Sequence, residues 1–322
     1  MPGLTTAQRE QFDRDGYLVV EGVLDPREDL QPVLDEYNRV LSGIASSLLD
    51  EGAIASTYDH LPFTERLTAI CQESGRNFPS HFDISLPQRG VTYDSPMHHG
   101  PAVFNLLTNP KLLATIESII GPEIYSNPVQ HIRMKLPERA VAKGSYNGLV
   151  TAVDWHQDNG VILPEADEAT ILTVWLPLTD STVENGCLRV IPGSQRAGLA
   201  DHCPSDRGVR IPPASIDLDK ATPLPIRAGG FLMMHQRTVH SSLENVTDDE
   251  VRISLDLRYQ PVGQPTGRPT FPGFVARSAS RPESVLRDGE TWDELWLAAR
   301  QRLAQDEDPA YNRWRSDAPA CA

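Results

Sequence analysis

The chain has 322 residues, of which 39% are hydrophobic and 23% are charged, within the range of globular proteins. Its formal net charge of −15 argues against a nucleic-acid or anionic-membrane partner. No apolar run reaches the roughly 20 residues that span a bilayer, and the N-terminus lacks the pattern of a signal peptide, so we expect a cytoplasmic protein. The cysteines favour a reducing compartment over a disulfide framework, because they are scattered and form no C-x-x-C pair: Cys71, Cys187, Cys203 and Cys321.

The first 124 residues predict helices around one short strand. Thr5 or Thr6 can cap a first helix that ends at Gly16, and a strand over residues 17–20 follows. Residues 57–100 are mixed in character and rich in turn formers. Apolar spacing predicts two further helices, one with Leu30, Val33, Leu34 and Tyr37 and one over residues 104–120 with a break at Asn109-Pro110.

After residue 124 the period changes to that of short strands separated by long polar connections. This pattern predicts a mainly β fold with flanking helices, either a sandwich or a jelly roll (double-stranded β-helix, cupin-like), rather than a parallel α/β sheet. We expect one domain over residues 1–322, with a jelly-roll core at 125–262 between N-terminal elements (1–124) and a C-terminal extension (263–322). The predicted strands are 129–135, 170–178, 187–191, 231–234 and 251–259, and a last helix covers 290–305.

An imidazole and a carboxylate stand two positions apart in His156-Gln157-Asp158. Residues i and i+2 of a strand point to the same face, so this pair can present two ligands to one metal ion. A second H-x-D, His81-Phe82-Asp83, has the same spacing, and the spacing alone does not separate them. Most such pairs are simply hydrogen-bonded or solvated.

A third ligand is needed for a 2-His-1-carboxylate iron site, and residues 229–259 offer two candidates. His235 and His240 are five residues apart, so only one of them faces the site if the segment is extended. Arg252 follows on the next predicted strand, where a buried guanidinium could grip a carboxylate with two hydrogen bonds.

Several segments, taken in order, resemble the phytanoyl-CoA dioxygenase family of Fe(II)/2-oxoglutarate-dependent oxygenases. The resemblance covers most of the chain and is densest in three motifs: DWHQD, LTVWLPLTDSTVENGCLRVIPGSQR and FLMMHQRTVHSSLENVTDDEVRISLDLRY. It implies a small-molecule oxygenase that uses Fe(II), 2-oxoglutarate and O2 and releases succinate and CO2. Hydroxylation of an unactivated C–H bond is the default outcome, because the carboxylate ligand that related halogenases lack is present here.

Carried over by position, the resemblance makes His156, Asp158 and His240 the iron ligands and leaves His235 and the second H-x-D outside the metal site. Arg252 would bind the distal carboxylate of 2-oxoglutarate, with Arg258 as a second candidate, because the spacing from His240 is slightly longer than usual. Ser241 stands where many relatives have glycine. Three further residues would help to hold the cosubstrate: Ser242, Trp175 and His131.

The substrate is the least determined part of the prediction. The acidic net charge and the lack of a Lys/Arg cluster disfavour a CoA thioester and favour a neutral or cationic small molecule. Candidate pocket residues are Trp155, Gln157, Asn159, Tyr58 and His98. Desaturation, epimerisation or cyclisation on the same site stays an alternative. A zinc hydrolase would need a general-base glutamate near the ligands, and a non-catalytic jelly-roll protein would have a damaged ligand set.

Overall fold

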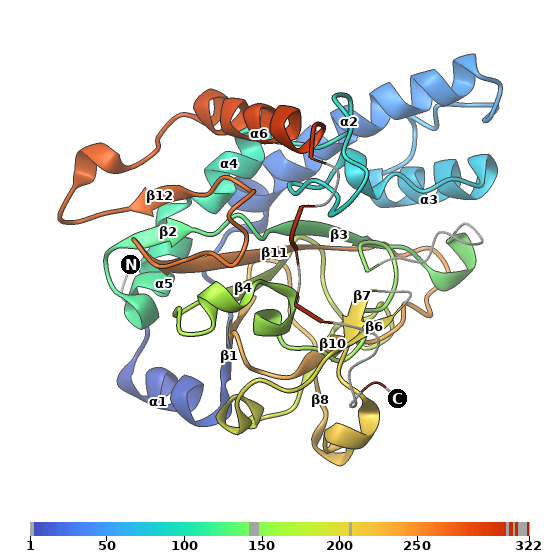
Figure 1. The fold of residues 1–322 in the computed structure, drawn as a ribbon. Helices are drawn as coiled ribbons and strands as arrows, with labels where there is room; N and C mark the ends of the chain where they lie inside the picture. Colours follow the sequence, from blue (N-terminus) through green and yellow to red (C-terminus); the bar gives the residue numbers. More distant parts are fainter. Residues whose placement is uncertain are drawn as a thin grey trace.

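Helices dominate the N-terminal part of the chain, and one more follows the sheets (Figure 1). The structure, a computed structural model, describes residues 3–141, 148–205, 208–306, 309–311, 313–314 and 321. Within these residues the α-helices are α1 (Thr6–Asp15), α2 (Gln31–Asp50), α3 (Phe63–Ser74), α4 (Pro101–Leu107), α5 (Pro110–Ile120) and α6 (Gly289–Leu303).

The strands form two antiparallel sheets and a hairpin. In the described residues the larger sheet has seven strands in the order β1-β9-β4-β11-β2-β12, with β3 also paired to β11, and the smaller sheet has the order β10-β5-β8. Hairpin β6–β7 stands apart. The strands are β1 (Tyr17–Val20), β2 (Ile124–Ser126), β3 (His131–Lys135), β4 (Leu172–Pro177), β5 (Leu188–Val190), β6 (Cys203–Ser205), β7 (Gly208–Arg210), β8 (Thr222–Leu224), β9 (Phe231–His235), β10 (His240–Ser242), β11 (Arg252–Pro261) and β12 (Phe274–Arg277).

The larger sheet has a helical side and a side that faces the smaller sheet. Helices α2, α3, α4 and α6 lie together on the helical side, where the main apolar core forms (Figure 1). A second apolar cluster fills the space between the two sheets and is built around Trp175, Val190 and Leu232. This mainly β arrangement with open sheets confirms the predicted jelly-roll class.

Strand β11 alternates between apolar and polar residues, which lie on opposite faces of the larger sheet. Its apolar residues belong to the core under the helices: Ile253, Leu255, Leu257 and Tyr259. Its alternate residues are polar and are buried too: Arg252, Ser254, Asp256 and Arg258. Alternation normally places the polar face in water, so a fully buried polar face indicates that this strand serves a site.

A buried carboxylate connects helices α2 and α4. Glu36 of α2 accepts hydrogen bonds from the backbone N–H groups of Ala102 (2.9 Å) and Val103 (3.3 Å), in the first turn of α4. A negative charge at this position satisfies free N–H groups and the positive end of the helix dipole. A Cβ at Gly100 would lie 2.2 Å from the Glu36 carboxyl, so a larger residue there would displace this carboxylate.

The predicted elements are confirmed with small shifts at their ends. Thr5 caps α1 and Gly16 ends it in the left-handed conformation. The helical segment near residue 110 is split into α4 and α5, with Asn109 capping the second. Helix α3 was not predicted, because residues 57–100 showed no clear period. Within the described residues, no helix has the length and apolar character that crossing a bilayer requires.

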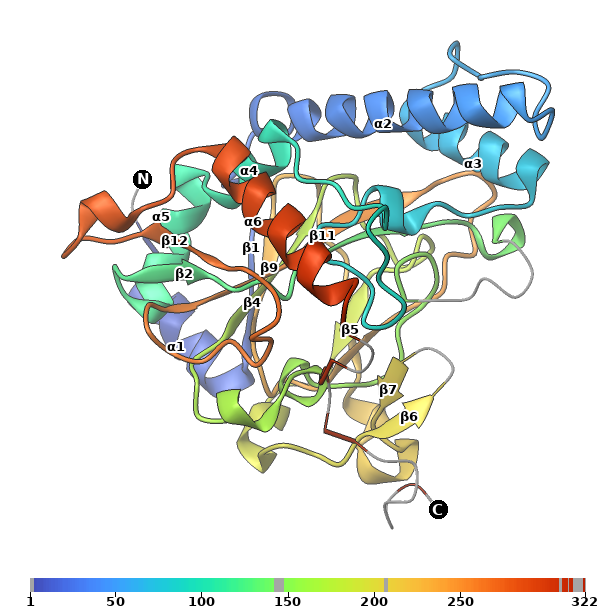
Figure 2. The ribbon, with the colours of Figure 1, turned by 45° about the horizontal axis from the view of Figure 1, so that its top comes forward.

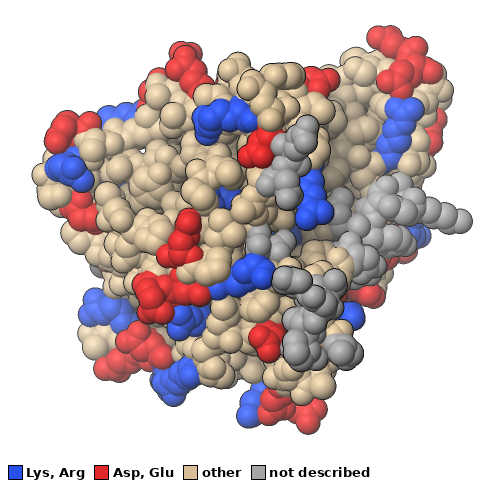
Figure 3. All heavy atoms as spheres, in the orientation of Figure 1, with Lys and Arg blue, Asp and Glu red and all other residues tan. Residues whose placement is uncertain are grey.

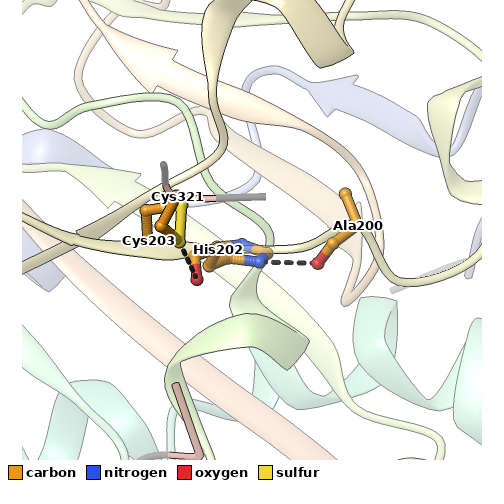
Figure 4. Close-up of a disulfide and its surroundings, with 4 residues drawn as sticks. All are labelled: Ala200, His202, Cys203 and Cys321. Carbon is orange, nitrogen blue, oxygen red and sulfur yellow. Dashed lines mark hydrogen bonds between the residues drawn. A yellow bond between two sulfur atoms is a disulfide. The ribbon is translucent and has the colours of Figure 1, made fainter. Parts of the chain in front are cut away.

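The cysteine prediction is wrong for two of the four residues. Cys203, at the start of β6, forms a disulfide with Cys321, beside the backbone of His202 (Figure 4). The other two cysteines, Cys71 and Cys187, are free and buried. The residues that form the disulfide are 118 positions apart, a separation at which sequence spacing gives no signal. The described parts of the C-terminal segment run from α6 toward hairpin β6–β7 (Figure 2).

Candidate metal and cosubstrate site

Two histidines are held side by side by their own backbones. The backbone N–H of His156 donates to the carbonyl of His240 (2.9 Å), and the reverse bond is 3.0 Å long. The ligand atoms of both histidines and of Asp158 lie within 4.8 Å of one another, and all three residues are buried. The Oδ1 atom of Asp158 lies 3.8 Å from Nε2 of His156 and 4.0 Å from Nε2 of His240.

Hydrogen bonds fix which nitrogen of each imidazole is available to a metal. Nδ1 of His156 lies 2.8 Å from the carbonyl of Asp154, and Nδ1 of His240 lies 3.0 Å from the carbonyl of Thr238. A carbonyl only accepts, so Nδ1 carries the proton and Nε2 keeps its lone pair. Burial, together with the neighbouring His240, lowers the pKa of His156 to about 3, which keeps this ligand neutral.

The carboxylate of Asp158 is held from two strands of the larger sheet. The Arg258 guanidinium donates to its Oδ1 at 2.5 Å, and the Thr173 hydroxyl donates to its Oδ2. Burial alone would raise the pKa of Asp158, but Arg258 and the two histidines outweigh it and hold that pKa well below its usual range. Arg258 was predicted only as a second candidate for the cosubstrate, and its contact with Asp158 was missed. The signal that could have found it is its place on the polar face of a strand.

Two cations lie next to each other at the other end of β11. Arg252 is fully buried and pairs in register with Lys135 of β3. Neither forms an ion pair with a carboxylate that the structure describes, and Nε and Nη2 of Arg252 have no hydrogen-bond partner there. Lys135 instead donates to Ser242 Oγ (2.7 Å) and to backbone carbonyls. Burial lowers the pKa of both cations, and for Lys135 the nearby Arg252 adds to it. An anion would satisfy both.

Two of the predicted cosubstrate residues surround this pair of cations. The Trp175 ring lies 5.2 Å from the Arg252 guanidinium carbon, and its Nε1–H has no partner among the described residues. The Ser242 hydroxyl accepts from Lys135 and from the backbone N–H of Val153 (2.9 Å), which leaves its proton to donate. Lys135 was missed as a site residue, because a lysine in an alternating strand usually points to solvent.

A cavity of about 560 Å³ opens beside the histidine pair. His156 and Arg258 line it on the metal side, and His131 and Arg133 of β3 line it further along. His131 is paired with Asp83 (2.9 Å), so the second H-x-D of the sequence supplies a partner for this histidine rather than a metal ligand. His235 does not line this cavity, and its Nδ1 accepts from the backbone N–H of Arg237.

The five residues predicted for the substrate pocket do not line this cavity. Gln157 and Asn159 are buried, and their amides form hydrogen bonds within the fold. Gln157 bonds to backbone groups of nearby loops, and Asn159 donates to Asp167. Trp155 packs against Arg189 on another surface. The remaining two belong to the helical layer, where Tyr58 donates to Glu73 and His98 contacts Glu36.

The donor set fits ferrous iron and 2-oxoglutarate. Two neutral imidazoles and one carboxylate form the 2-His-1-carboxylate arrangement of non-haem Fe(II) oxygenases. The donors of Arg252 and Trp175 that lack described partners are of the kind from which a carboxylate accepts hydrogen bonds. Basic and acidic side chains alternate over the face in Figure 3, and the described atoms drawn there form no continuous basic patch.

Comparisons with known proteins agree with this chemistry. A model of the family "Phytanoyl-CoA dioxygenase (PhyH)" matches residues 12–254, which include all three candidate ligands and Arg252. A Danio rerio protein, phytanoyl-CoA dioxygenase domain-containing protein 1, is 27% identical over 77% of this chain and 87% of its own length. The 1-deoxypentalenic acid 11-beta-hydroxylase of Streptomyces arenae is 25% identical over 80% of this chain and 81% of its own.

Solved structures show the same fold. The non-heme monooxygenase ThoJ superposes with a TM-score of 0.59 at 19% identity, over 92% of this chain and 97% of that one. EvdO2 from Micromonospora carbonacea var. aurantiaca, complexed with 2-oxoglutarate, superposes with a TM-score of 0.50 at 20% identity, over 83% and 97%. The chain belongs to the phytanoyl-CoA dioxygenase family of Fe(II)- and 2-oxoglutarate-dependent oxygenases.

Proposed function

We propose that the protein hydroxylates an unactivated C–H bond of a small organic molecule and releases succinate and CO2 from 2-oxoglutarate. The observation that carries the proposal is the buried triad of His156, Asp158 and His240, of which His156 lines a cavity of small-molecule size. A relative named as a hydroxylase supports this outcome over desaturation, epimerisation or cyclisation.

Each residue of the site has a distinct task in this proposal. The Nε2 atoms of His156 and His240 and a carboxylate oxygen of Asp158 hold the iron. Arg252 holds the far carboxylate of 2-oxoglutarate, with Ser242 and Trp175 beside it, while His131 lies on the cavity side of β3. When bound, iron and 2-oxoglutarate activate dioxygen for C–H oxidation. The protein's own part is to orient these groups and to exclude water.

The test is an anaerobic titration of metal-free protein with Fe(II) and 2-oxoglutarate. We expect the visible charge-transfer band that arises only when a keto acid chelates protein-bound iron. His240→Ala should abolish the band, and His235→Ala should retain it, because His235 stands five positions away and contacts Arg237 instead. A folded wild-type protein without the band, or a band that survives in His240→Ala, would refute the proposal.

The cytoplasmic location is also proposed rather than established. It rests on the sequence. The Cys203–Cys321 disulfide favours an oxidising compartment instead, because reducing compartments keep most thiols free. Rapid alkylation of intact cells followed by mass spectrometry tests the location. A cytoplasmic protein should show alkylated Cys203 and Cys321, whereas a peptide pair still joined by the disulfide would contradict the assignment.

A further inference from the structure

Arg268 is a buried cation of the cavity beside the metal site for which the described residues provide no carboxylate partner. Arg258 is paired with Asp158, Arg133 with Asp256, and His131 with Asp83. Arg89 lies at an exposed edge. Arg268 is only 2% exposed, and no carboxylate described in the structure forms an ion pair with it.

The guanidinium of Arg268 is held in place but is not satisfied. Its Nη2 donates to the carbonyl of Val161 (2.6 Å), at the end of the short helix that begins with Asp158. The ring of Tyr311 lies 4.8 Å from its central carbon, with Phe271 beyond it at 5.8 Å. Its buried Nε–H has no acceptor among the described residues. A buried charge without a counter-ion is costly, and a bound anion relieves the cost.

The remaining walls of the cavity indicate the rest of the ligand. Apolar side chains line it on several sides: Val129, Val153, Val161, Val209 and Trp314. A cavity that combines these apolar side chains with polar ones and one buried cation lacking a described carboxylate partner is complementary to an amphipathic acid. This anion site is separate from that of the cosubstrate, because Arg268 lines the cavity and Arg252 does not.

We infer that Arg268 binds a carboxylate of the substrate, and that the substrate is an apolar organic acid whose apolar body fills the cavity. This inference rests on the proposed function, whose substrate class it names. It departs from the neutral or cationic substrate that the net charge favoured, because the local charges of the cavity, not those of the whole surface, contact a ligand. The family match ends at residue 254, so Arg268 and Trp314 add walls from outside the matched segment.

The test compares acids with amides of the same shape. Isothermal titration of the protein, saturated with 2-oxoglutarate to occupy the other anion site, would use octanoate, decanoate and adamantane-1-carboxylate against the three matching primary amides. We expect at least one acid to bind tenfold or more tightly than its amide. Equal binding of every pair, or no binding of any acid at millimolar concentration, overturns the inference without any variant being needed.

Variants then assign the preference to Arg268. Arg268→Gln can still donate to the Val161 carbonyl but should lose the preference for the acid, whereas Arg268→Lys should keep part of it. Arg277→Gln, an arginine of β12 that pairs with Glu117 away from the cavity, should behave as wild type. An unchanged preference in Arg268→Gln overturns the assignment. Arg252→Met should lose the charge-transfer band yet keep the acid preference. Failure of the proposed function can therefore be distinguished from failure of the inference about Arg268.

Discussion

Asp158 is both a candidate metal ligand and the ion-pair partner of the buried Arg258. In the absence of metal its charge is balanced by Arg258, which is itself 3% exposed and has no other carboxylate within ion-pair distance in the described chain. A buried guanidinium that loses its partner costs several kcal/mol, whereas a truncated histidine leaves no charge behind. The ligands of one site therefore differ in what their removal does to the fold.

Alanine substitutions at two ligands should separate binding from stability. Both Asp158→Ala and His240→Ala should lose stoichiometric Fe(II), measured as iron retained after gel filtration. In urea unfolding of the metal-free proteins, Asp158→Ala should be about 3 kcal/mol less stable than wild type, because Arg258 is left buried and unpaired. His240→Ala should be affected less. An Asp158→Ala protein as stable as wild type would show that the Arg258 pair does not form.

Arg252 makes the reverse prediction. Arg252→Met removes an unpaired buried cation, so the metal-free protein should be as stable as wild type or more stable. The same change should weaken 2-oxoglutarate binding by at least about tenfold, since a charge-assisted bidentate contact is lost. Calorimetric titration and urea unfolding measure the two effects, with Arg277→Met as the control. A loss of both stability and affinity would indicate a structural role only.

Among the elements, the strands and helices with clear periods were predictable. For β11, the sequence predicted the two faces of the strand but not the environment of each. Its alternation fixed which residues share a face, but not that the polar face would be buried, because burial depends on the smaller sheet packed over it. The separation of His156 from His240 along the chain is closed by a backbone bridge between segments outside any predicted hairpin. Sequence motifs could therefore nominate the ligands, whereas their geometry required the assembled sheets.

The contact between α2 and α4 gives a pH-dependent prediction. Hydrogen bonds from His98 and the α4 backbone overcome the effect of burial and hold the pKa of Glu36 below its ordinary value of about 4.3. A depressed folded-state pKa contributes stability above the ordinary pKa, and this contribution is lost as the pH falls through the folded-state value. At pH 7, Glu36→Gln should lower the free energy of unfolding by about 1–3 kcal/mol.

The difference between Glu36→Gln and wild type should shrink as the pH falls below the ordinary glutamate pKa of about 4.3 and through the lower folded-state pKa of Glu36. Urea unfolding at pH 7, 5 and 3.5 measures this difference, and a gap that stays constant over the series would contradict the assignment. Glu73→Gln is a suitable control, because that carboxylate bonds to Tyr58 in the same layer but caps no helix.

For the molecule as a whole, the features that sequence could not reveal are those that join distant segments. Composition and motifs were sufficient for the fold class, the family and the ligand set. The cavity walls were not predictable, because they bring together β3, β11, the hairpin β6–β7 and the C-terminal segment. Trp314 donates from its indole N–H to the carbonyl of Gly160 (2.5 Å) and stacks on His202, next to the disulfide. None of these contacts has a local sequence signal.

Loss of the disulfide should weaken the whole fold. Cys321→Ser releases a link that closes a loop of 118 residues, and such links typically contribute about 2–4 kcal/mol by restricting the unfolded chain. We expect a lower unfolding midpoint in urea, with Fe(II) binding retained because the triad does not involve the C-terminal segment. A Cys71→Ser protein is the control for a buried free thiol. Equal midpoints for Cys321→Ser and wild type would indicate that the link does not form.

The same disulfide constrains how the enzyme is handled at the bench. Ferrous iron must be protected from oxidation, and thiols such as dithiothreitol are a common choice, yet they attack disulfides by exchange. Opening the bond would remove one attachment of the segment that carries Trp314, which lines the cavity proposed for the substrate. Ascorbate is not a thiol and leaves the bond closed. Substrate screens run in the two reductants would therefore sample differently shaped cavities, and a compound missed in one could be turned over in the other.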